Sequence, residues 1–197
     1  MNLAQSRRKL LVFSLLCIWS LPGLAAPAGR CPNGEMEDTF SQNDITQKAE
    51  AFFGAMTEGL GTVVEKVFRE QGRPNAYIAG TEASGAIGVG LRYGEGTVFY
   101  RCGGSRKVFW QGPSVGWDVG ANASKTFVLI YNLKQQDSIF QRFPGVEGTF
   151  YYVAGVGVNY QRTDDIVLAP IRTGVGLRAG ANIGYLHYTR KHSWLPL

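Results

Sequence analysis

The amino-acid sequence predicts a mainly β protein, a small soluble antiparallel β-barrel with one amphipathic N-terminal helix packed on it. Two observations carry this prediction. From Tyr77 onward, short apolar stretches are separated by turn residues, which is typical of antiparallel barrels and sandwiches. In several of these stretches, above all in 82–120, large apolar residues alternate with glycines, as in a strand with one filled and one bare face.

Residues 1–28 have the three parts of a signal peptide. Basic residues stand at 7–9, an apolar run follows at 10–21, and small residues lead to an expected cleavage after Ala26 or Ala28. The apolar run is shorter than the roughly 20 residues of a membrane-spanning helix, which disfavours an uncleaved anchor. We therefore expect secretion through the inner membrane, removal of the leader and a location in the periplasm.

The charge balance excludes one large class of partner. The chain carries 20 basic and 15 acidic residues, and three of the basic ones leave with the leader, so the mature balance is 17 to 15. Because the sequence contains no clustered basic run, we expect no binding to nucleic acid. The remaining length suits a single domain with a proper core.

Two cysteines follow the leader, Cys31 and Cys102. In an oxidising compartment they can form a disulfide. Two free thiols are the alternative, and it stays open here because a sequence does not give the separation of two Cα atoms.

Residues 29–43 are polar and turn-rich, and they are predicted to be a flexible segment before a domain at 44–197. A helical pattern begins near Asp44, which could cap the helix with Gln47 in the capping-box position. Apolar residues then recur along one helical face as far as Phe68.

Three glycines weaken this helix, and a kink or break is expected at 59–61 before Gly72 and Pro74 end it. Its lysines and arginines are offset by glutamates. Because an interfacial membrane helix usually has a basic polar face, packing on a sheet is the favoured interpretation, and binding to a membrane or partner is the alternative.

Strands are expected through the rest of the chain, apart from 135–143, which is spaced like one or two helical turns. A turn is expected at Tyr93–Gly96. The stretch 125–131 is apolar on both faces and should be covered on both sides. The expected strands are 77–80, 85–93, 96–101, 106–111, 114–120, 125–131, 149–161, 166–169 and 175–190, the last with a bend or split at Gly180.

The regular glycines suggest a tightly curved sheet or the close approach of another element, such as the helix. Glycine-rich alternating strands after a leader also describe outer-membrane proteins, which makes a membrane-inserted β-barrel an alternative. The long helical segment and the uneven strand lengths favour the soluble barrel.

The sequence offers little catalytic chemistry. Its two histidines, His187 and His192, have no cysteine or carboxylate cluster at ligand spacing, so no metal site is expected. Ser84 and Ser114 lack a strand–turn–helix context, and the glycine-rich stretch 88–96 lacks the lysine of a phosphate loop. We therefore expect no cofactor and no enzymatic activity.

Four carboxylates lie in the strand region: Glu82, Glu95, Asp118 and Asp165. Asp118 is the unusual one, because it shares the bare glycine face of its strand. One interpretation is an ion pair with Arg92 or Arg172, and the other is a polar group in a ligand groove.

A ligand surface, if the protein has one, is expected where aromatic area meets a few polar groups. The alternative for the aromatic residues is that they form the barrel core. The candidate ligand-binding residues are Tyr93, Trp110, Trp117, Asp118 and Arg172.

Four blocks of the sequence occur in the order known from one family: GRPNAYIAG (72–80), EASGAIGVGLRYGEG (82–96), KVFWQGPSVGWDVG (107–120) and VLAPIRTGVGLRAGANIGYLHYTR (167–190). Through them the chain resembles, over about 44–195, the envelope integrity protein A family, a domain-of-unknown-function family of exported alphaproteobacterial proteins. The resemblance implies a small soluble periplasmic β-barrel with a helix, without known catalytic residues, that helps to maintain the cell envelope. It lends the disulfide no support.

More distantly, the glycine-rich strands followed by YGEG (93–96) look like the SYLF lipid-binding domains, which would imply contact with lipid. Together these features predict a non-enzymatic periplasmic protein that supports envelope integrity, with an envelope lipid, a glycoconjugate or an envelope protein as its partner. An enzyme acting on envelope polymers is the alternative from another class. It would need two carboxylates at hydrolytic separation, roughly 5–10 Å.

Overall fold

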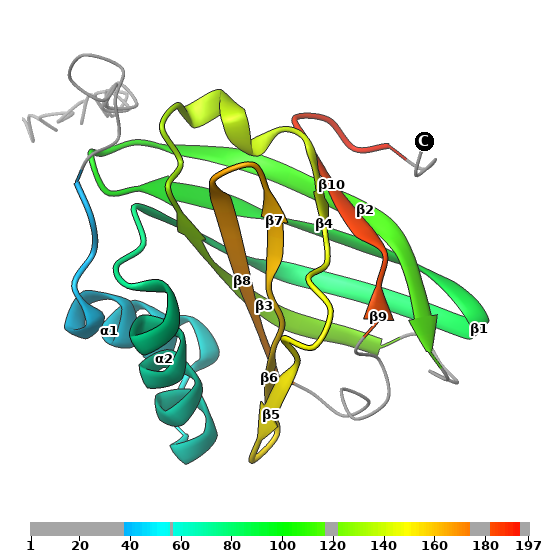
Figure 1. Cartoon of the computed structure of the whole chain (residues 1–197), viewed down its shortest axis with the longest axis horizontal. Coiled ribbons are helices and arrows are strands. Elements are labelled where there is room, and N and C mark those ends of the chain that lie inside the picture. Colours follow the sequence, from blue (N-terminus) through cyan, green and yellow to red (C-terminus); the bar gives the residue numbers. More distant parts are fainter. Residues whose placement is uncertain (1–37, 56, 117–121, 174–181, 194–197) are drawn as a thin grey trace, which may run out of the picture.

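The computed structural model describes residues 38–55, 57–116, 122–173 and 182–193 (Figure 1). Within them it contains one sheet and two α-helices, which confirms the mainly β fold. The helices are α1 (Gln42–Phe53) and α2 (Glu58–Gln71), with a short 3-10 helix η2 (Gln136–Ile139). The strands are β1 (Ala76–Tyr100), β2 (Ser105–Gly116), β3 (Asn122–Tyr131), β4 (Arg142–Pro144), β5 (Tyr151–Val153), β6 (Val156–Val158), β7 (Gln161–Thr163), β8 (Ile166–Thr173), β9 (Asn182–Ile183) and β10 (Tyr185–Thr189).

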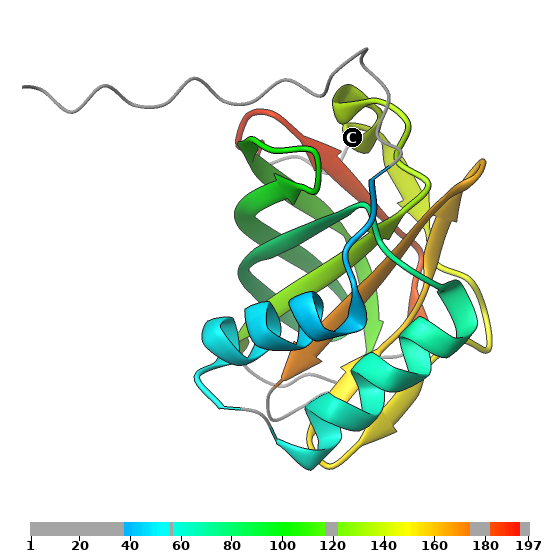
Figure 2. The ribbon, with the colours of Figure 1, turned by 90° about the vertical axis from the view of Figure 1, so that its left-hand side faces the viewer.

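The described strands form one antiparallel sheet in the order β4-β10-β2-β1-β3-β8-β6-β5, with β7 on β8 and β9 on β2. This sheet curls until β4 approaches β7. Gly145 and Gln161 form a bridge there, and the Val146 amide donates to the Tyr160 carbonyl at 2.9 Å. The result is the expected barrel-like sheet, with both helices lying against its outer surface (Figure 2).

Strand β1 reverses direction along its length and supplies two neighbouring parts of the sheet (Figure 1). Residues 76–84 pair with β3, and residues 88–99 pair with β2. The two halves lie against each other, because the Arg101 amide donates to the Asn75 carbonyl at 3.0 Å. The chain therefore turns between the two paired ranges. The turn predicted at Tyr93–Gly96 is wrong, because these residues pair with β2.

Apolar side chains form a layer on each face of the sheet. Alternate residues of a strand point to opposite faces. Strand β3 accordingly sends Val128 and Ile130 into the barrel and Phe127 and Leu129 toward the helices, all with 0% exposed area. The prediction that this stretch is covered on both sides is confirmed. The inner layer also contains Ile78, Val98, Val108, Trp110, Leu133, Ile139, Phe143, Leu168, Leu186 and Tyr188.

The helices pack on the sheet, as predicted. Their buried apolar face consists of Ile45, Ala49, Leu60, Val63, Val64 and Val67. Burial of a branched apolar side chain of this size contributes about 1.5–3 kcal/mol relative to leaving it exposed, which outweighs the weak helix propensity of the glycines. No helix in the described ranges is long and apolar enough to cross a membrane.

The helix landmarks differ from those predicted. Ser41 caps α1: its hydroxyl accepts a hydrogen bond from the Asp44 amide at 3.1 Å, and the Asp44 carboxylate accepts one from the Ser41 amide at 3.1 Å. Asp44 therefore completes the capping box and is not the cap itself. The helix ends at Gly54, whose φ of 94° suits glycine, and Thr57 caps α2. The break thus lies between Phe53 and Glu58, not at 59–61.

Gly59 lies inside α2 because the helix closely approaches the β5–β6 hairpin at this residue. A Cβ atom on Gly59 would lie 2.6 Å from the Val153 carbonyl oxygen and 2.9 Å from that of Ala154. The glycine that was expected to break the helix therefore allows it to contact the sheet.

The packed domain begins before residue 44. Phe40 is 4% exposed, and its ring meets that of Tyr77 edge-on with centroids 5.4 Å apart. The end of the segment predicted to be flexible, 29–43, thus belongs to the core from Phe40 onward.

Later strands are present as predicted but differ in extent. β2 joins two predicted strands into one. The predicted strand 149–161 is divided into β5, β6 and β7, and the turn at Ala154, with φ of 45°, separates the first two. η2 confirms the helical turn expected within 135–143. The first part of the last predicted strand, with its bend or split at Gly180, lies outside the described residues.

Candidate functional site

The five predicted ligand-binding residues occupy different places in the structure. Trp110 and Arg172 point into the barrel, where they are 2% and 4% exposed. Tyr93 lies on the outer face of β1, because it follows the inward-pointing Arg92. Trp117 and Asp118 lie outside the described residues. The residues that can be placed therefore do not form one groove.

Glu82 is the centre of a polar cluster inside the barrel. Its carboxylate accepts hydrogen bonds from Arg172 Nε at 2.9 Å and from Trp110 Nε1 at 2.8 Å, and it lies 3.3 Å from Arg92 Nη1. Asn159 Oδ1 accepts a further hydrogen bond from Arg172 Nη1 at 2.7 Å. Because removing charges from water costs several kcal/mol per ion, such a cluster requires this degree of pairing.

The charge state of Glu82 follows from these partners. Burial alone would raise the pKa of its carboxyl group, because a low dielectric disfavours the charged form. The positive charges of Arg172 and Arg92, with hydrogen bonds from Arg172 and Trp110, outweigh burial and hold the pKa below its ordinary value. Glu82 is therefore a carboxylate at neutral pH and stays paired.

The glycines of β1 form the surface on which the Trp110 ring lies. Gly94 pairs with Trp110 across the sheet, and a Cβ atom on Gly94 would lie 2.0 Å from Trp110 Cε2. A Cβ atom on Gly80 would lie 2.8 Å from Trp110 Cη2. A Cβ atom on Gly80 would also lie 2.3 Å from the Glu95 carbonyl oxygen on the other half of β1. Gly94, expected in a turn, thus makes room for a tryptophan inside the barrel, and Gly80, expected at the end of a strand, makes room for this tryptophan and for the second half of β1.

The inside of the barrel is polar near Glu82 and apolar toward η2. Gln161 and Thr126 are 0% exposed, and Gln161 Oε1 accepts a hydrogen bond from the Tyr188 hydroxyl at 3.4 Å. Toward η2, Phe143 and Leu186 are both 0% exposed. Side chains of the chain itself thus occupy the interior along the described strands.

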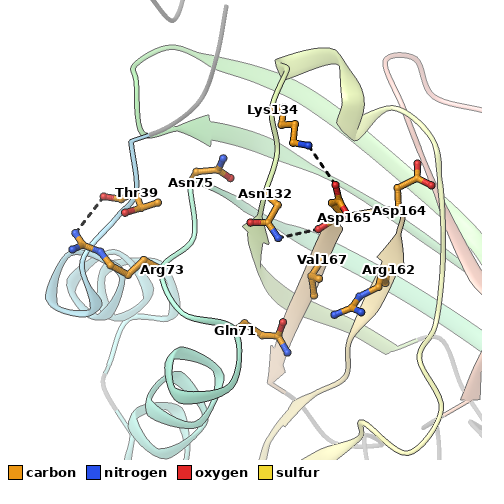
Figure 3. Close-up of a pocket in the computed structure, with 10 residues that line it drawn as sticks. All are labelled: Thr39, Gln71, Arg73, Asn75, Asn132, Lys134, Arg162, Asp164, Asp165 and Val167. Atoms are coloured by element: carbon orange, nitrogen blue, oxygen red, sulfur yellow. Dashed lines mark hydrogen bonds and ion pairs between the residues drawn. The ribbon is translucent and has the colours of Figure 1, made fainter.

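A surface pocket of about 680 Å³ lies outside the barrel, near the C-terminal end of α2, the β7–β8 turn and the segment after β3 (Figure 3). Charged and amide side chains dominate its lining. The lining residues are Thr39, Gln71, Arg73, Asn75, Asn132, Lys134, Arg162, Asp164, Asp165 and Val167. None of them was predicted as a ligand-binding residue.

Several of these polar groups are fixed by contacts within the protein. Asn75 is buried, donates to the Leu133 carbonyl at 2.9 Å and accepts from the Leu133 amide at 3.3 Å. Lys134 pairs with Asp165 at 3.3 Å, and Asn132 Nδ2 donates to the Asp165 carbonyl at 2.9 Å. These contacts hold two walls of the pocket in place.

Arg162 and Asp164 are exposed at the β7–β8 turn and have no ion-pair partner within the described part of the chain. Asp164 has a left-handed backbone with φ of 51°, and Asn132 across the pocket has φ of 58°. Asn and Asp adopt this conformation more readily than other non-glycine residues. The pocket therefore presents the Arg162 guanidinium and the Asp164 carboxylate without a charged partner among the described residues, whereas the Arg73 guanidinium donates to the Phe40 and Thr39 carbonyl oxygens.

The family model for envelope integrity protein A matches residues 38–197. The chain belongs to the envelope integrity protein A family. The structure also resembles the crystal structure of a beta-barrel-like, uncharacterized protein from Brucella abortus, with 45% sequence identity and a TM-score of 0.73. That match covers 81% of this chain and 99% of the other. No curated protein matches the chain. The resemblance seen in the sequence blocks is thus confirmed.

The key residue that sequence reasoning missed in this family member is Glu82. The sequence presents it only as one of four carboxylates in the strand region, with Arg92 and Arg172 as partners for Asp118. Both arginines instead contact Glu82. The missing information was the reversal of β1, which brings Glu82 and Arg92 together on adjacent halves of one strand.

The described residues of this family member hold no group of three or more His, Cys, Asp or Glu that could bind a metal ion. Cys102 is disulfide-bonded. Cys31, its predicted partner, lies outside the described residues, so that pairing stays a prediction.

Proposed function

We propose that this protein is a non-enzymatic periplasmic protein that supports the integrity of the cell envelope by binding an envelope glycoconjugate in the surface pocket. The observation that carries the proposal is a contrast between two places. The pocket measures about 680 Å³ and has a mainly polar lining, whereas the barrel encloses its own packed side chains. The surface pocket suits a hydrophilic ligand, whereas the packed interior of the barrel leaves little room for an apolar one.

The pocket offers what a sugar requires. Sugar hydroxyl groups both donate and accept hydrogen bonds, so their site should supply both functions. Arg162 supplies donors, Asp164 supplies acceptors, and the amide of Gln71 supplies both. The volume lies within the roughly 300–1,000 Å³ of small-molecule sites. Because Asn75 and Asp165 are already held by the protein, ligand binding would order few additional side chains.

An acyl chain inside the barrel is less well supported. It would have to displace apolar side chains such as Phe143 and Leu186, which are 0% exposed. Losing the packing of even one such residue costs about 2–5 kcal/mol. A lipid bound inside the barrel is therefore less favoured than a glycoconjugate bound in the surface pocket.

The state of Glu82 supports a non-enzymatic role. A general acid that works near neutral pH needs a raised pKa, whereas burial of Glu82 is outweighed by its arginine partners and its pKa is lowered. In the pocket, Asp165 is already paired with Lys134. A hydrolytic carboxylate pair therefore has little support in the described residues, and the enzyme remains the alternative.

Two features support the periplasm as the compartment. The first 28 residues have the pattern of a cleaved leader, and Cys102 is disulfide-bonded. Disulfides persist in oxidising compartments and are rare in the cytosol.

The test measures binding of soluble oligosaccharides, released from the envelope of the same bacterium, by isothermal titration calorimetry. We expect saturable binding that falls at least tenfold in the double variant Arg162→Ala, Asp164→Ala. The matched control is Arg69→Ala, which removes an arginine that is 67% exposed on α2 outside the pocket. Equal binding by the double variant and wild type, or no saturable binding by wild type, would contradict the proposal.

A genetic arm addresses the role in the envelope. A strain that lacks the protein should be sensitive to detergent, and the wild-type gene should restore resistance. The double variant should fail to do so despite normal protein levels, whereas Arg69→Ala should succeed.

A further inference from the structure

The outer face of β2, β4 and β10, with the adjoining second half of β1, is not covered by the helices (Figure 1). The helices instead pack on β3, β6, β8 and the first half of β1, and Phe99 near the end of β1 also contacts that cluster. We call this surface the uncovered face and define it by Leu91, Tyr93, Phe109, Pro113, Pro144 and Tyr185. It goes beyond the proposed pocket, with which it shares no residue.

Four of these residues form an apolar row across four adjacent strands. Leu91 pairs with Pro113, and Tyr185 pairs with Pro144. Gly184 joins the two pairs, because a Cβ atom on it would lie 3.6 Å from Pro113 Cγ. Neighbouring strands lie about 4.8 Å apart, so the row is roughly 14 Å wide.

The four side chains point outward. Alternate residues of a strand face opposite sides, and residues an odd number of positions away from these four belong to the inner layer. Leu186 and Phe143 occupy the inside beside Tyr185 and Pro144. Leu91 is 41% exposed, which is unusual for a leucine within a long strand of this sheet. An apolar row on an open sheet face is a surface that is suited to contact something other than water.

Cations lie beside this row and beyond it, toward the η2 end of the strands. Arg142 lies over the Tyr185 ring at 5.5 Å, and Lys107 lies over the Phe109 ring at 5.5 Å. Arginine and lysine can place their apolar stems on such rings while the charge stays in water. Toward that end the cations are Arg106, Lys107, Arg142, Arg190 and Lys191. Lys107 pairs with Glu95, and Arg106 and Arg190 pair with Asp137. Glu147 follows β4 at the other end, so the described charges leave a modest positive excess.

We propose that the uncovered face docks on the surface of an anionic lipid bilayer. Tyrosine and leucine suit the boundary between headgroups and acyl chains, and Arg142 with the positive excess toward the η2 end of the strands is attracted to anionic headgroups. The sheet would lie on the membrane and would not cross it. A second copy of this chain is disfavoured as the occupant, because two cationic faces would repel each other.

The experiment is sedimentation of the exported protein, with its N-terminus verified by mass spectrometry, together with lipid vesicles. Vesicles of phosphatidylglycerol mixed with phosphatidylcholine are compared with phosphatidylcholine alone. We expect binding to the anionic vesicles that weakens with added salt. Arg142→Ala should weaken it about fivefold, the effect of one cation near an anionic surface. Leu91→Asp should weaken it at least as much.

Two matched controls make these losses specific. Val146→Asp changes a residue that is also 41% exposed but lies outside the row. Arg162→Ala removes an exposed arginine of the pocket. Both should bind vesicles like wild type. Circular dichroism and thermal unfolding should show that Leu91→Asp is folded.

Three results would overturn the proposal. Wild type that fails to bind anionic vesicles would show that this face does not dock on an anionic bilayer. A dimer in analytical ultracentrifugation that Leu91→Asp dissolves would assign the face to a second copy. Equal binding by wild type and Leu91→Asp would place vesicle contact elsewhere.

Discussion

Glu82→Gln is the substitution that most directly tests the cluster inside the barrel. Glutamine preserves the shape of the side chain but removes the carboxylate that contacts both Arg172 and Arg92. Hydrogen bonds to charged groups contribute about 1.5–3 kcal/mol each. Breaking one partner of a buried ion pair typically costs about 3–5 kcal/mol, because the remaining charge is left without compensation. We therefore expect the free energy of unfolding to fall by about 3–5 kcal/mol.

Such a loss is a large part of the roughly 5–15 kcal/mol that keeps a domain folded. Urea unfolding at pH 7, followed by tryptophan fluorescence, measures it. The matched control is Glu95→Gln, because Glu95 pairs with Lys107 at 3.4 Å where the side chains are 55% and 51% exposed. Exposed pairs contribute little, so this variant should change stability by less than about 1 kcal/mol. A loss below about 1 kcal/mol in Glu82→Gln would refute the structural role of the cluster.

The pH dependence of stability in wild type and Glu82→Gln tests the charge state of Glu82. The pKa of Glu82 is lowered in the folded protein, because its arginine partners outweigh burial. A lowered pKa stabilises the folded state above the unfolded value, about 4.3 for glutamate, and this stability is lost as the pH falls through the folded value. Wild type and Glu82→Gln should therefore differ most near pH 7, and the difference should shrink as the pH falls below about 4. A constant difference from pH 7 to pH 3 would contradict this assignment.

Two more predictions concern the packing and the disulfide. Gly94→Ala should destabilise the protein by about 1–3 kcal/mol or more, because the new Cβ would lie 2.0 Å from the Trp110 ring. Gly184→Ala, whose Cβ would make only an ordinary contact at 3.6 Å, should be nearly neutral in the same urea assay. Peptide mapping without reduction should link the peptides that contain Cys31 and Cys102. A Cys102 peptide attached to any other cysteine would show that the predicted pairing is wrong.

The fold class was predictable because its signals are local. Alternation along a strand and apolar residues on both faces of 125–131 are read from strand geometry alone. The helix break was not predictable, because glycine at 59 weakens a helix in isolation but is required where α2 contacts Val153. A tertiary contact there outweighs the intrinsic propensity.

The candidate site was predictable only in part. Trp110 and Arg172 were chosen as large aromatic and charged residues, and the structure places both in the cluster around Glu82. Their common partner depends on the turn within β1, and a pairing of distant residues leaves no periodic trace in the sequence. The surface pocket was missed for a related reason: Gln71, Asn132 and Arg162 are ordinary residues at the ends of elements that meet only in the folded chain.

The buried cluster around Glu82 favours one register of β1 in the barrel. A buried ion pair adds little net stability compared with apolar packing, but it penalises any arrangement that leaves one partner uncompensated. A one-residue slip of β1 would turn Glu82 to the outer face and leave Arg172 buried without its carboxylate. The glycines at 80 and 94 act in the same direction, because a Cβ atom at either position would clash with the Trp110 ring that donates to Glu82. With the interior committed to this role, ligand recognition is expected on the outside of the barrel, at the pocket and the uncovered face.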